Sequence, residues 1–154
     1  MKKLIIAGIV LFLVLAGCSR PAGEYLDRGD TLFKQGKLTE AALSYRKAIS
    51  KDAKLGKAYL GIGKTALQGN DFGEAYRALT VALQLMPDDA EVLRLQSEVA
   101  MGAYLIDPKH PAYLKANLLT VADRLERLNP KTPEGLKIRG LVAATEGEHR
   151  TALD

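Results

Sequence analysis

The sequence predicts an all-α fold, a solenoid of stacked antiparallel helix pairs. Residues 22–55 align with residues 56–89 without a gap, and several residues recur 34 positions later. Apolar residues at helical spacing continue over residues 90–105 and again up to about Leu128. A period of roughly 20 to 50 residues is typical of repeat arrays, in which every unit is one small supersecondary element. We therefore expect successive helix pairs.

The recurring residues include an aromatic side chain, a glycine, a glutamate and two alanines. The pairs are Tyr25 and Tyr59, Gly29 and Gly63, Glu40 and Glu74, Ala41 and Ala75, and Ala48 and Ala82. Gly and Ala are expected where two helices cross closely, because only small side chains let the backbones approach. Large residues fill the space around the crossings, and we expect this of Tyr25, Leu32, Tyr45, Tyr59, Ile62 and Leu79.

This pattern resembles the tetratricopeptide repeat, which has an aromatic residue at its fourth position, Gly at the eighth, Ala at the twentieth and twenty-seventh, and often Pro at the thirty-second, here Pro87. The resemblance implies a solenoid of about three and a half repeats. The units are residues 22–55, 56–89, 90–132 with an insertion, and a partial unit 133–154.

Turn and cap residues mark the ends of the helices in the first two units. Gly36 and Asn70 lie between the paired helices, and both residue types accept the left-handed conformation that ends a helix. Pro87 closes the second unit. Asp88 or Asp89 is expected to cap the next helix.

The third and fourth units are less regular. The third, residues 90–132, is longer than the first two, and its helical spacing is broken over residues 106–111. An insertion between its two helices is the simplest explanation. The fourth unit begins at Pro133, and its Gly140 and Ala152 repeat the Gly-to-Ala step of 12 seen in the first two units. We expect the array to continue beyond residue 154. The second helix of the third unit is expected to bury Leu114, Leu118, Val121, Leu125 and Leu128.

The N-terminal residues have the order of an export signal. Lys2 and Lys3 precede an uncharged run over residues 4–17. As a helix this run is about 21 Å long, against roughly 30 Å for a bilayer core, which disfavours a short membrane anchor. Its ending, LAGC, resembles the lipobox of bacterial lipoproteins. The resemblance implies a cleaved signal peptide 1–17, a lipid on Cys18 and a tether 18–21. An Asp directly after the cysteine would resemble the signal that retains lipoproteins in the inner membrane. The residue here is Ser19, which favours the periplasmic face of the outer membrane.

Composition argues against several other kinds of site. Cys18 is the only cysteine, so no intramolecular disulfide or multi-cysteine metal site is possible. His110 and His149 are far apart without partners at ligand spacing, so we expect no metal. The formal charge of +4 falls to +2 without Lys2 and Lys3, and no block of like charges remains to bind nucleic acid. The only cofactor expected is the lipid.

The stretch Ala58–Thr65, AYLGIGKT, fits a loose form of the phosphate-binding loop. Such a loop needs a buried strand before it, whereas here a helical segment and a short turn precede Ala58. Tyr59, Ile62 and Gly63 are already expected to pack within a helix. Ser44 and Ser97 also lack a glycine-flanked nucleophile turn. We therefore expect no enzyme, and nucleotide binding through AYLGIGKT is a remote alternative.

The repeat resemblance also implies a concave groove, formed by the first helix of each unit, that binds a peptide or helix of a partner protein. Residues Leu26 and Asp30 stand where chaperone-binding members have Lys and Asn, so their carboxylate clamp is not expected. The apolar positions could instead be ordinary core. The implied groove positions are Leu26, Asp30, Phe33, Lys34, Lys57, Leu60, Lys64, Leu67, Gln68, Arg94, Glu98 and Met101.

The leading hypothesis is a membrane-anchored periplasmic scaffold that assists assembly of an envelope complex, such as a pilus, a secretion channel, an outer-membrane insertase or an exopolysaccharide export system. The alternative is a protein that binds envelope carbohydrate. That alternative requires aromatic residues exposed in the groove, and Phe33 is the one candidate.

Overall fold

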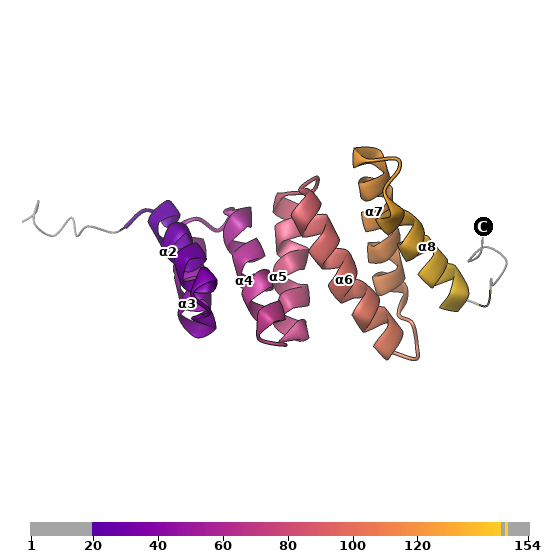
Figure 1. Ribbon diagram of the computed structural model, residues 1–154, viewed down its shortest axis with the longest axis horizontal. Coiled ribbons are helices and arrows are strands. Elements are labelled where there is room, and N and C mark those ends of the chain that lie inside the picture. The colour runs from indigo at the N-terminus through magenta and orange to yellow at the C-terminus, as the bar shows by residue number, and fades with distance from the viewer. Residues whose placement is uncertain (1–19, 146, 148–154) are drawn as a thin grey trace, which may run out of the picture.

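The computed structural model describes residues 20–145 and 147, and within them the chain is all-α. Figure 1 shows the helices side by side along the long axis of the molecule, in chain order from α2 to α8. Each helix packs mainly against its neighbours in sequence, as in a solenoid. The helices are α2 (Ala22–Lys34), α3 (Leu38–Lys51), α4 (Gly56–Gln68), α5 (Phe72–Leu85), α6 (Ala90–Ile106), α7 (Ala112–Leu128) and α8 (Pro133–Thr145).

Close helix crossings occur at the glycines that the repeat period singles out. A Cβ atom added at Gly29 of α2 would lie 2.5 Å from Cε1 of Tyr45 in α3. One unit later, a Cβ atom at Gly63 of α4 would lie 2.7 Å from Cγ of Leu79 in α5. Both pairs therefore make the same contact, one repeat apart. This confirms the expected packing role of both glycines.

A second glycine contact joins the first unit to the next. The Tyr45 ring also lies against Gly61 of α4, where an added Cβ atom would be 2.5 Å from Cε1. The ring is 1% exposed and is held between the backbones of α2 and α4. The sequence analysis did not identify Gly61, because the corresponding residue of the first unit is Asp27.

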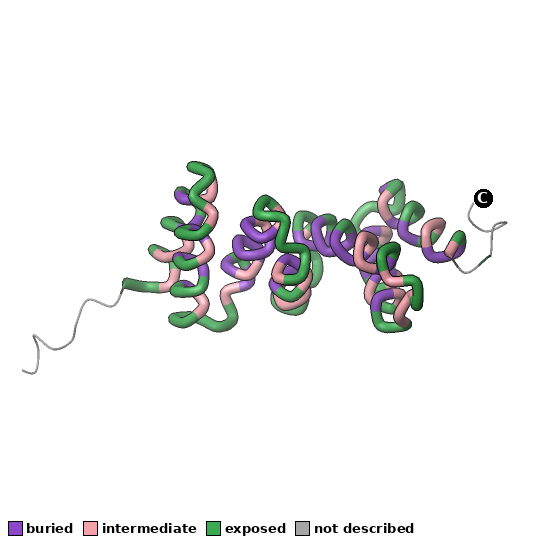
Figure 2. The backbone as a smooth tube through the Cα atoms, turned by 90° about the horizontal axis from the view of Figure 1, so that it is seen from below, coloured by how far each residue is buried: buried purple, intermediate pink, exposed green. Residues whose placement is uncertain are grey.

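The core follows the inner sides of the helices, where buried residues form stripes in Figure 2. The four predicted alanines, Ala41, Ala48, Ala75 and Ala82, are fully buried. Of the predicted large residues, Leu32, Tyr45, Ile62 and Leu79 are buried, and Tyr25 and Tyr59 are half-buried against the core.

The turns and caps follow the sequence expectation. Gly36 and Asn70 have φ angles of 74° and 59°, the left-handed conformation expected where a helix ends. Asp89 caps α6, because its side chain accepts hydrogen bonds from the amides of Glu91 and Val92. Pro87 lies in the link before α6.

The extra length of the third unit is not a single insertion between its helices. The helix α6 has 17 residues against 13 in α4, and α7 has 17 against 14 in α5. The connector between α6 and α7, residues 107–111, is also longer than the connector at residues 69–71. Together these three differences account for all of the extra length of the third unit. The expectation of one insertion was wrong because both longer helices keep helical spacing.

The end of α7 differs from expectation in one further respect. Leu114, Leu118, Val121 and Leu125 are buried, as predicted. Leu128 is 49% exposed, because it is the last residue of α7 and lies beyond the packed part of the helix. The fourth unit begins at Pro133 with α8, in which Gly140 is half-buried.

Several predicted features lie outside the described residues. They are the signal peptide 1–17, Cys18, Ser19, His149 and Ala152. Among the helices that the structure describes, none has the length and apolar character needed to cross a bilayer.

Candidate functional site

The first helices of three units, α2, α4 and α6, share a groove that contains two adjoining hollows. The first, of about 340 Å³, we call the charged hollow. The second, of about 440 Å³, we call the central hollow. Both are bordered by Phe33 of α2, Lys64 of α4 and Glu91 of α6, so these three side chains separate the two hollows.

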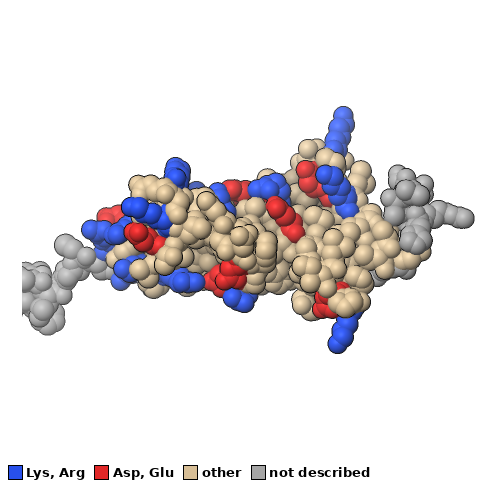
Figure 3. Space-filling model, turned by 60° about the horizontal axis from the view of Figure 1, so that its bottom comes forward, with Lys and Arg blue, Asp and Glu red and all other residues tan. Residues whose placement is uncertain are grey.

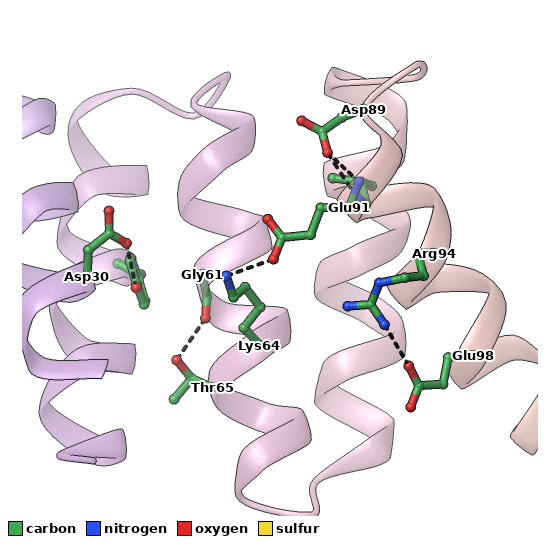
Figure 4. Close-up of polar contacts among 10 residues, drawn as sticks. Asp30, Gly61, Lys64, Thr65, Asp89, Glu91, Arg94 and Glu98 are labelled. Carbon is green, nitrogen blue, oxygen red and sulfur yellow. Dashed lines mark hydrogen bonds and ion pairs between the residues drawn. The ribbon is translucent and has the colours of Figure 1, made fainter. Parts of the chain in front are cut away.

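Lys64 holds the middle of the groove through contacts to both neighbouring helices. Its ammonium nitrogen lies 2.8 Å from Oε1 of Glu91, as Figure 4 shows. The same nitrogen lies 5.7 Å from the centre of the Phe33 ring, within the range of a cation–π interaction. The ion pair is solvent-exposed and contributes at most about 1 kcal/mol to folding. Its main effect is to fix the positions of three groove side chains.

Asp30 is tied to the core beneath the charged hollow. The hydroxyl of Tyr45 donates a hydrogen bond of 2.7 Å to Oδ1 of Asp30. Burial of the Tyr45 ring, and then the hydrogen bond and charge of Asp30, raise the pKa of this tyrosine well above its usual range. Tyr45 therefore stays neutral and donates this hydrogen bond, which occupies one acceptor site of Oδ1 and leaves the other acceptor sites of Asp30 open.

The charged hollow has two lysines without an internal partner. Lys34 of α2 and Lys57 of α4 are exposed, and neither forms an ion pair with another described residue. Lys57 lies in the first turn of α4, where the positive end of the helix dipole adds to its charge. The same hollow is also bordered by the carboxylates of Asp30, Asp89 and Glu91, so its lining offers both signs of charge to a partner. Figure 3 shows Lys and Arg side chains gathered toward the α2–α3 end.

The α6 wall of the central hollow carries an internal ion pair. The guanidinium of Arg94 lies 3.3 Å from Oε2 of Glu98, one helical turn further on, and Figure 4 shows both beside the groove. Met101, on the same helix, is half-buried and borders a smaller hollow with Arg94 and Glu98.

Comparison with known proteins identifies the repeat that forms this groove. Residues 32–99 match the tetratricopeptide repeat family model. This match runs from the end of α2 into α6. No curated protein gives a significant match to the chain. Together with the helix packing, the match makes the fold a TPR-type solenoid, and TPR units act as interaction modules through extended concave surfaces.

All twelve residues that the TPR resemblance assigns to the groove border one of these hollows. Seven line the charged hollow, and the others line the central hollow or the smaller one beside Met101. The structure thus brings the set together on α2, α4 and α6. Leu60 is buried, so it contributes to the core as well as to the lining of the charged hollow.

Glu91 was missed as a groove residue. It lies one repeat after Lys57, just as Arg94 lies one repeat after Leu60 and Glu98 one repeat after Lys64. Applying the same repeat shift to Lys57 would have found it. Tyr45 was expected only in the core, yet it also borders the charged hollow, and its long-range bond to Asp30 has no signal in the sequence spacing.

The stretch AYLGIGKT does not form a phosphate loop. All eight residues lie inside α4, where backbone amides are used within the helix. The Thr65 hydroxyl donates to the carbonyl oxygen of Gly61, and Lys64 is paired with Glu91. Nucleotide binding through this stretch therefore loses its structural basis.

The other candidate side chains have structural contacts. His110 Nδ1 lies 2.9 Å from the carbonyl oxygen of Tyr104, and the two rings are 4.7 Å apart. The Ser97 hydroxyl donates to the carbonyl oxygen of Arg94, and Ser44 is buried. Within residues 20–145 and 147, no three His, Cys, Asp or Glu residues are grouped as metal ligands.

Proposed function

We propose that this protein is a lipid-anchored interaction scaffold of the bacterial cell envelope, whose groove on α2, α4 and α6 holds a segment of a partner protein. The observation that carries the proposal is the groove itself. Its hollows are lined by charged and apolar side chains drawn from three repeat units, and the TPR match covers most of them. Mixed linings of this kind suit a peptide, which presents both kinds of group.

The sequence supports the membrane anchor. A lipid on Cys18 would be separated from α2, which begins at Ala22, by a tether of residues 18–21. Four extended residues reach at most about 14 Å. The repeat array would therefore lie close to the membrane surface. The proposed location is the periplasmic face of the outer membrane. The proposed partners are components of an envelope complex, such as a pilus, a secretion channel, an outer-membrane insertase or an exopolysaccharide exporter.

The carbohydrate alternative finds one exposed aromatic side chain in the groove. Sugar binding would require an aromatic face free for stacking. The Phe33 ring carries the Lys64 ammonium on one face, whereas Phe72 borders the central hollow and is 60% exposed. The mixture of charged and apolar side chains in the lining favours a peptide over a sugar.

The test is a chemical crosslinking pulldown of the full-length protein from its native envelope, with mass spectrometry of the captured proteins. We expect one envelope complex to dominate, and Lys57→Glu to reduce its capture, because Lys57 borders the charged hollow without an ion pair to another described residue. Lys47→Glu, on the exposed side of α3, is the control and should capture normally. Capture of polysaccharide without any protein would contradict the proposal.

The anchor has a separate test. Cys18→Ser should leave an unprocessed precursor that is larger on a gel than the mature protein, since lipidation precedes cleavage in the lipoprotein pathway. A mature-sized band from Cys18→Ser would refute the lipid anchor and leave the groove proposal standing.

A further inference from the structure

The positive charge of the described residues is concentrated in the first unit and the residues just before it. Residues 20–55 carry eight Lys and Arg against five Asp and Glu, a net charge of +3. Residues 56–145 carry eleven against ten, a net charge of +1 over a segment more than twice as long. Figure 3 shows the corresponding gathering of Lys and Arg toward the α2–α3 end. An uneven distribution of this kind favours an anionic partner at that end of the array.

Four of these basic residues lie on the side of the array where the tether joins α2. The helix α2 begins at Ala22 and α3 ends at Lys51, and the two helices are antiparallel, so these ends lie together on the upper side in Figure 1. Lys54 follows in the link to α4, which lies on the same side. We call the four residues the basic edge: Arg20, Lys47, Lys51 and Lys54.

The basic edge is exposed, and its lysines have no internal ion-pair partner. None of the three lysines forms an ion pair with another described residue. Arg20 lies 3.8 Å from Oε2 of Glu24, an exposed pair that water screens. The other carboxylate on this side is Asp52, which accepts a hydrogen bond from the backbone amide of Lys54. The edge therefore presents four cations against two carboxylates, and the cations are in excess.

The sign of the charge changes at the next link on the same side of the array. The link between α5 and α6 contains Asp88 and Asp89, and Figure 1 places it on the upper side as well. Between the two links, Lys57 begins α4, but it borders the charged hollow and is not counted in the basic edge. An anionic surface would therefore attract the α2–α3 end of the array and repel the α5–α6 link.

The proposed lipid anchor brings such a surface within reach of the basic edge. Arg20 stands two residues after Cys18, so an extended tether places it at most about 7 Å from the lipidated residue. Surface charges act over about 8 Å at physiological ionic strength. One lysine near an anionic membrane strengthens binding roughly five-fold. A lipid chain and a basic patch are also a known pair of signals for stable membrane attachment.

We propose that the basic edge binds the headgroups of anionic phospholipids and so fixes the orientation of the array, with its first unit against the membrane and the later units held away from it. The inference rests on the proposed lipid anchor. The edge residues border neither hollow, so the groove stays open to a partner protein, and substituting one of them leaves the groove lining intact. An acidic protein or polysaccharide on this edge is an outcome of the test.

The test measures the reactivity of single lysines in the lipidated full-length protein on nanodiscs. One set of discs contains phosphatidylcholine alone, and the other contains equal parts of phosphatidylcholine and phosphatidylglycerol. A brief acetylation is followed by mass spectrometry, which gives the labelling rate of each lysine. Two exposed lysines without an ion pair to a described residue are internal controls: Lys109, in the connector on the lower side, and Lys131, in the α7–α8 link on the upper side.

A double variant, Lys47→Gln with Lys54→Gln, removes two charges from the edge and keeps Lys51 as the reporter. Its matched control is Lys109→Gln with Lys131→Gln, which removes two charges elsewhere. All four side chains are exposed, and circular dichroism checks that helicity is unchanged.

We expect Lys47, Lys51 and Lys54 to react about five-fold or more slowly on the phosphatidylglycerol discs than on the phosphatidylcholine discs. Lys109 and Lys131 should react equally on both. The protection should disappear at about 1 M salt, where the Debye length is about 3 Å. In the edge variant, Lys51 should regain the rate that it has on phosphatidylcholine, whereas the matched control variant should keep Lys51 protected.

Equal rates of the edge lysines on both kinds of disc would overturn the inference and leave the edge free for an acidic protein or polysaccharide. Protection that extends to Lys131 would also overturn it, because the array would then lie flat on the membrane. Protection of Lys51 that persists in the edge variant or at high salt would do the same. In each of these cases the protein stays on the discs, so the lipid anchor stands. A protein that does not stay on either kind of disc would refute the anchor together with this inference, and the groove proposal would remain.

Discussion

The crossing of α2 and α3 offers a matched pair of glycine substitutions on one helix. Gly23 and Gly29 both lie in α2, but a Cβ atom at Gly23 meets nothing within 4 Å, whereas one at Gly29 lies 2.5 Å from the Tyr45 ring. The ring cannot move away freely, because Gly61 confines its other side and Asp30 holds its hydroxyl. Replacing each glycine by alanine therefore tests the packing with the same chemical change.

The two variants should shift stability in opposite directions. Alanine is better than glycine in a helix by about 0.5–1 kcal/mol, and Gly23→Ala should gain up to this amount. Overpacking a confined site costs about 1–3 kcal/mol. For Gly29→Ala we take the upper part of this range, so the net loss is about 1–2 kcal/mol after the helix gain. The variants should differ by about 2–3 kcal/mol.

The assay is urea unfolding followed by circular dichroism, with thermal melts as a second measurement. A difference of about 2–3 kcal/mol corresponds to about 10 °C in Tm for a domain of this size. Equal stability of Gly23→Ala and Gly29→Ala would refute the close crossing, and with it the repeat register that equates Gly29–Tyr45 with Gly63–Leu79.

Three further predictions concern single interactions. Asp89→Ala should cost about 1 kcal/mol in urea unfolding, because it removes the α6 cap, whereas Asp88→Ala, exposed and outside the cap, should be neutral. Tyr45→Phe should cost about 0.5–1.5 kcal/mol by losing the bond to Asp30. The pKa of Tyr45 is raised in the folded protein, so its contribution to the free energy of unfolding is fully present below about pH 10 and is lost as the pH rises further. In an alkaline titration, the stability of the unmodified protein should therefore fall toward that of Tyr45→Phe. The pKa of Glu74 is lowered mainly by the hydrogen bond from Arg77, and next by that from Arg46. Its contribution to the free energy of unfolding is therefore present above the unfolded pKa of about 4.3 and is lost as the pH falls through the lower folded pKa. An unfolding series below about pH 5 should therefore be flatter for Glu74→Gln, and an unchanged slope would contradict the pairing.

The sequence was most informative where residues recur. Gly29 and Gly63 could be placed at crossings because the same residue stands at both positions, and Gly36 and Asn70 could be placed in turns because few residues tolerate positive φ. Gly61 could not be found this way, because it packs against Tyr45 from the preceding unit and has no glycine counterpart one repeat earlier.

The groove was predictable as a set of helix positions, but its internal contacts were not. Helical spacing and the repeat shift place Phe33, Lys64 and Arg94 on one side of their helices. The contacts of Lys64 with Phe33 and Glu91 join three units, and they depend on how those units are rotated against one another. A repeat pattern within single helices does not specify that rotation.

An apolar recess of about 510 Å³ between α5 and α6 was not predictable from periodicity. Phe72 and Ile106 are separated by one repeat length, yet Phe72 begins the second helix of its unit and Ile106 ends the first helix of the next, so the repeat does not relate them. Both side chains border this recess, because α6 is longer than α4 and diverges from α5. Helical spacing is the same in a long helix as in a short one, and it does not report the angle between neighbours.

The most direct test of the groove as a partner-binding surface is photocrosslinking in living cells at two matched glutamines. A photoreactive amino acid replaces either Gln68, which borders the central hollow, or Gln84, which is exposed on α5 and borders neither hollow of the groove. The groove proposal predicts a discrete crosslinked envelope protein from position 68 and none from position 84. A crosslinked partner from position 84 alone, or from neither position, would contradict it.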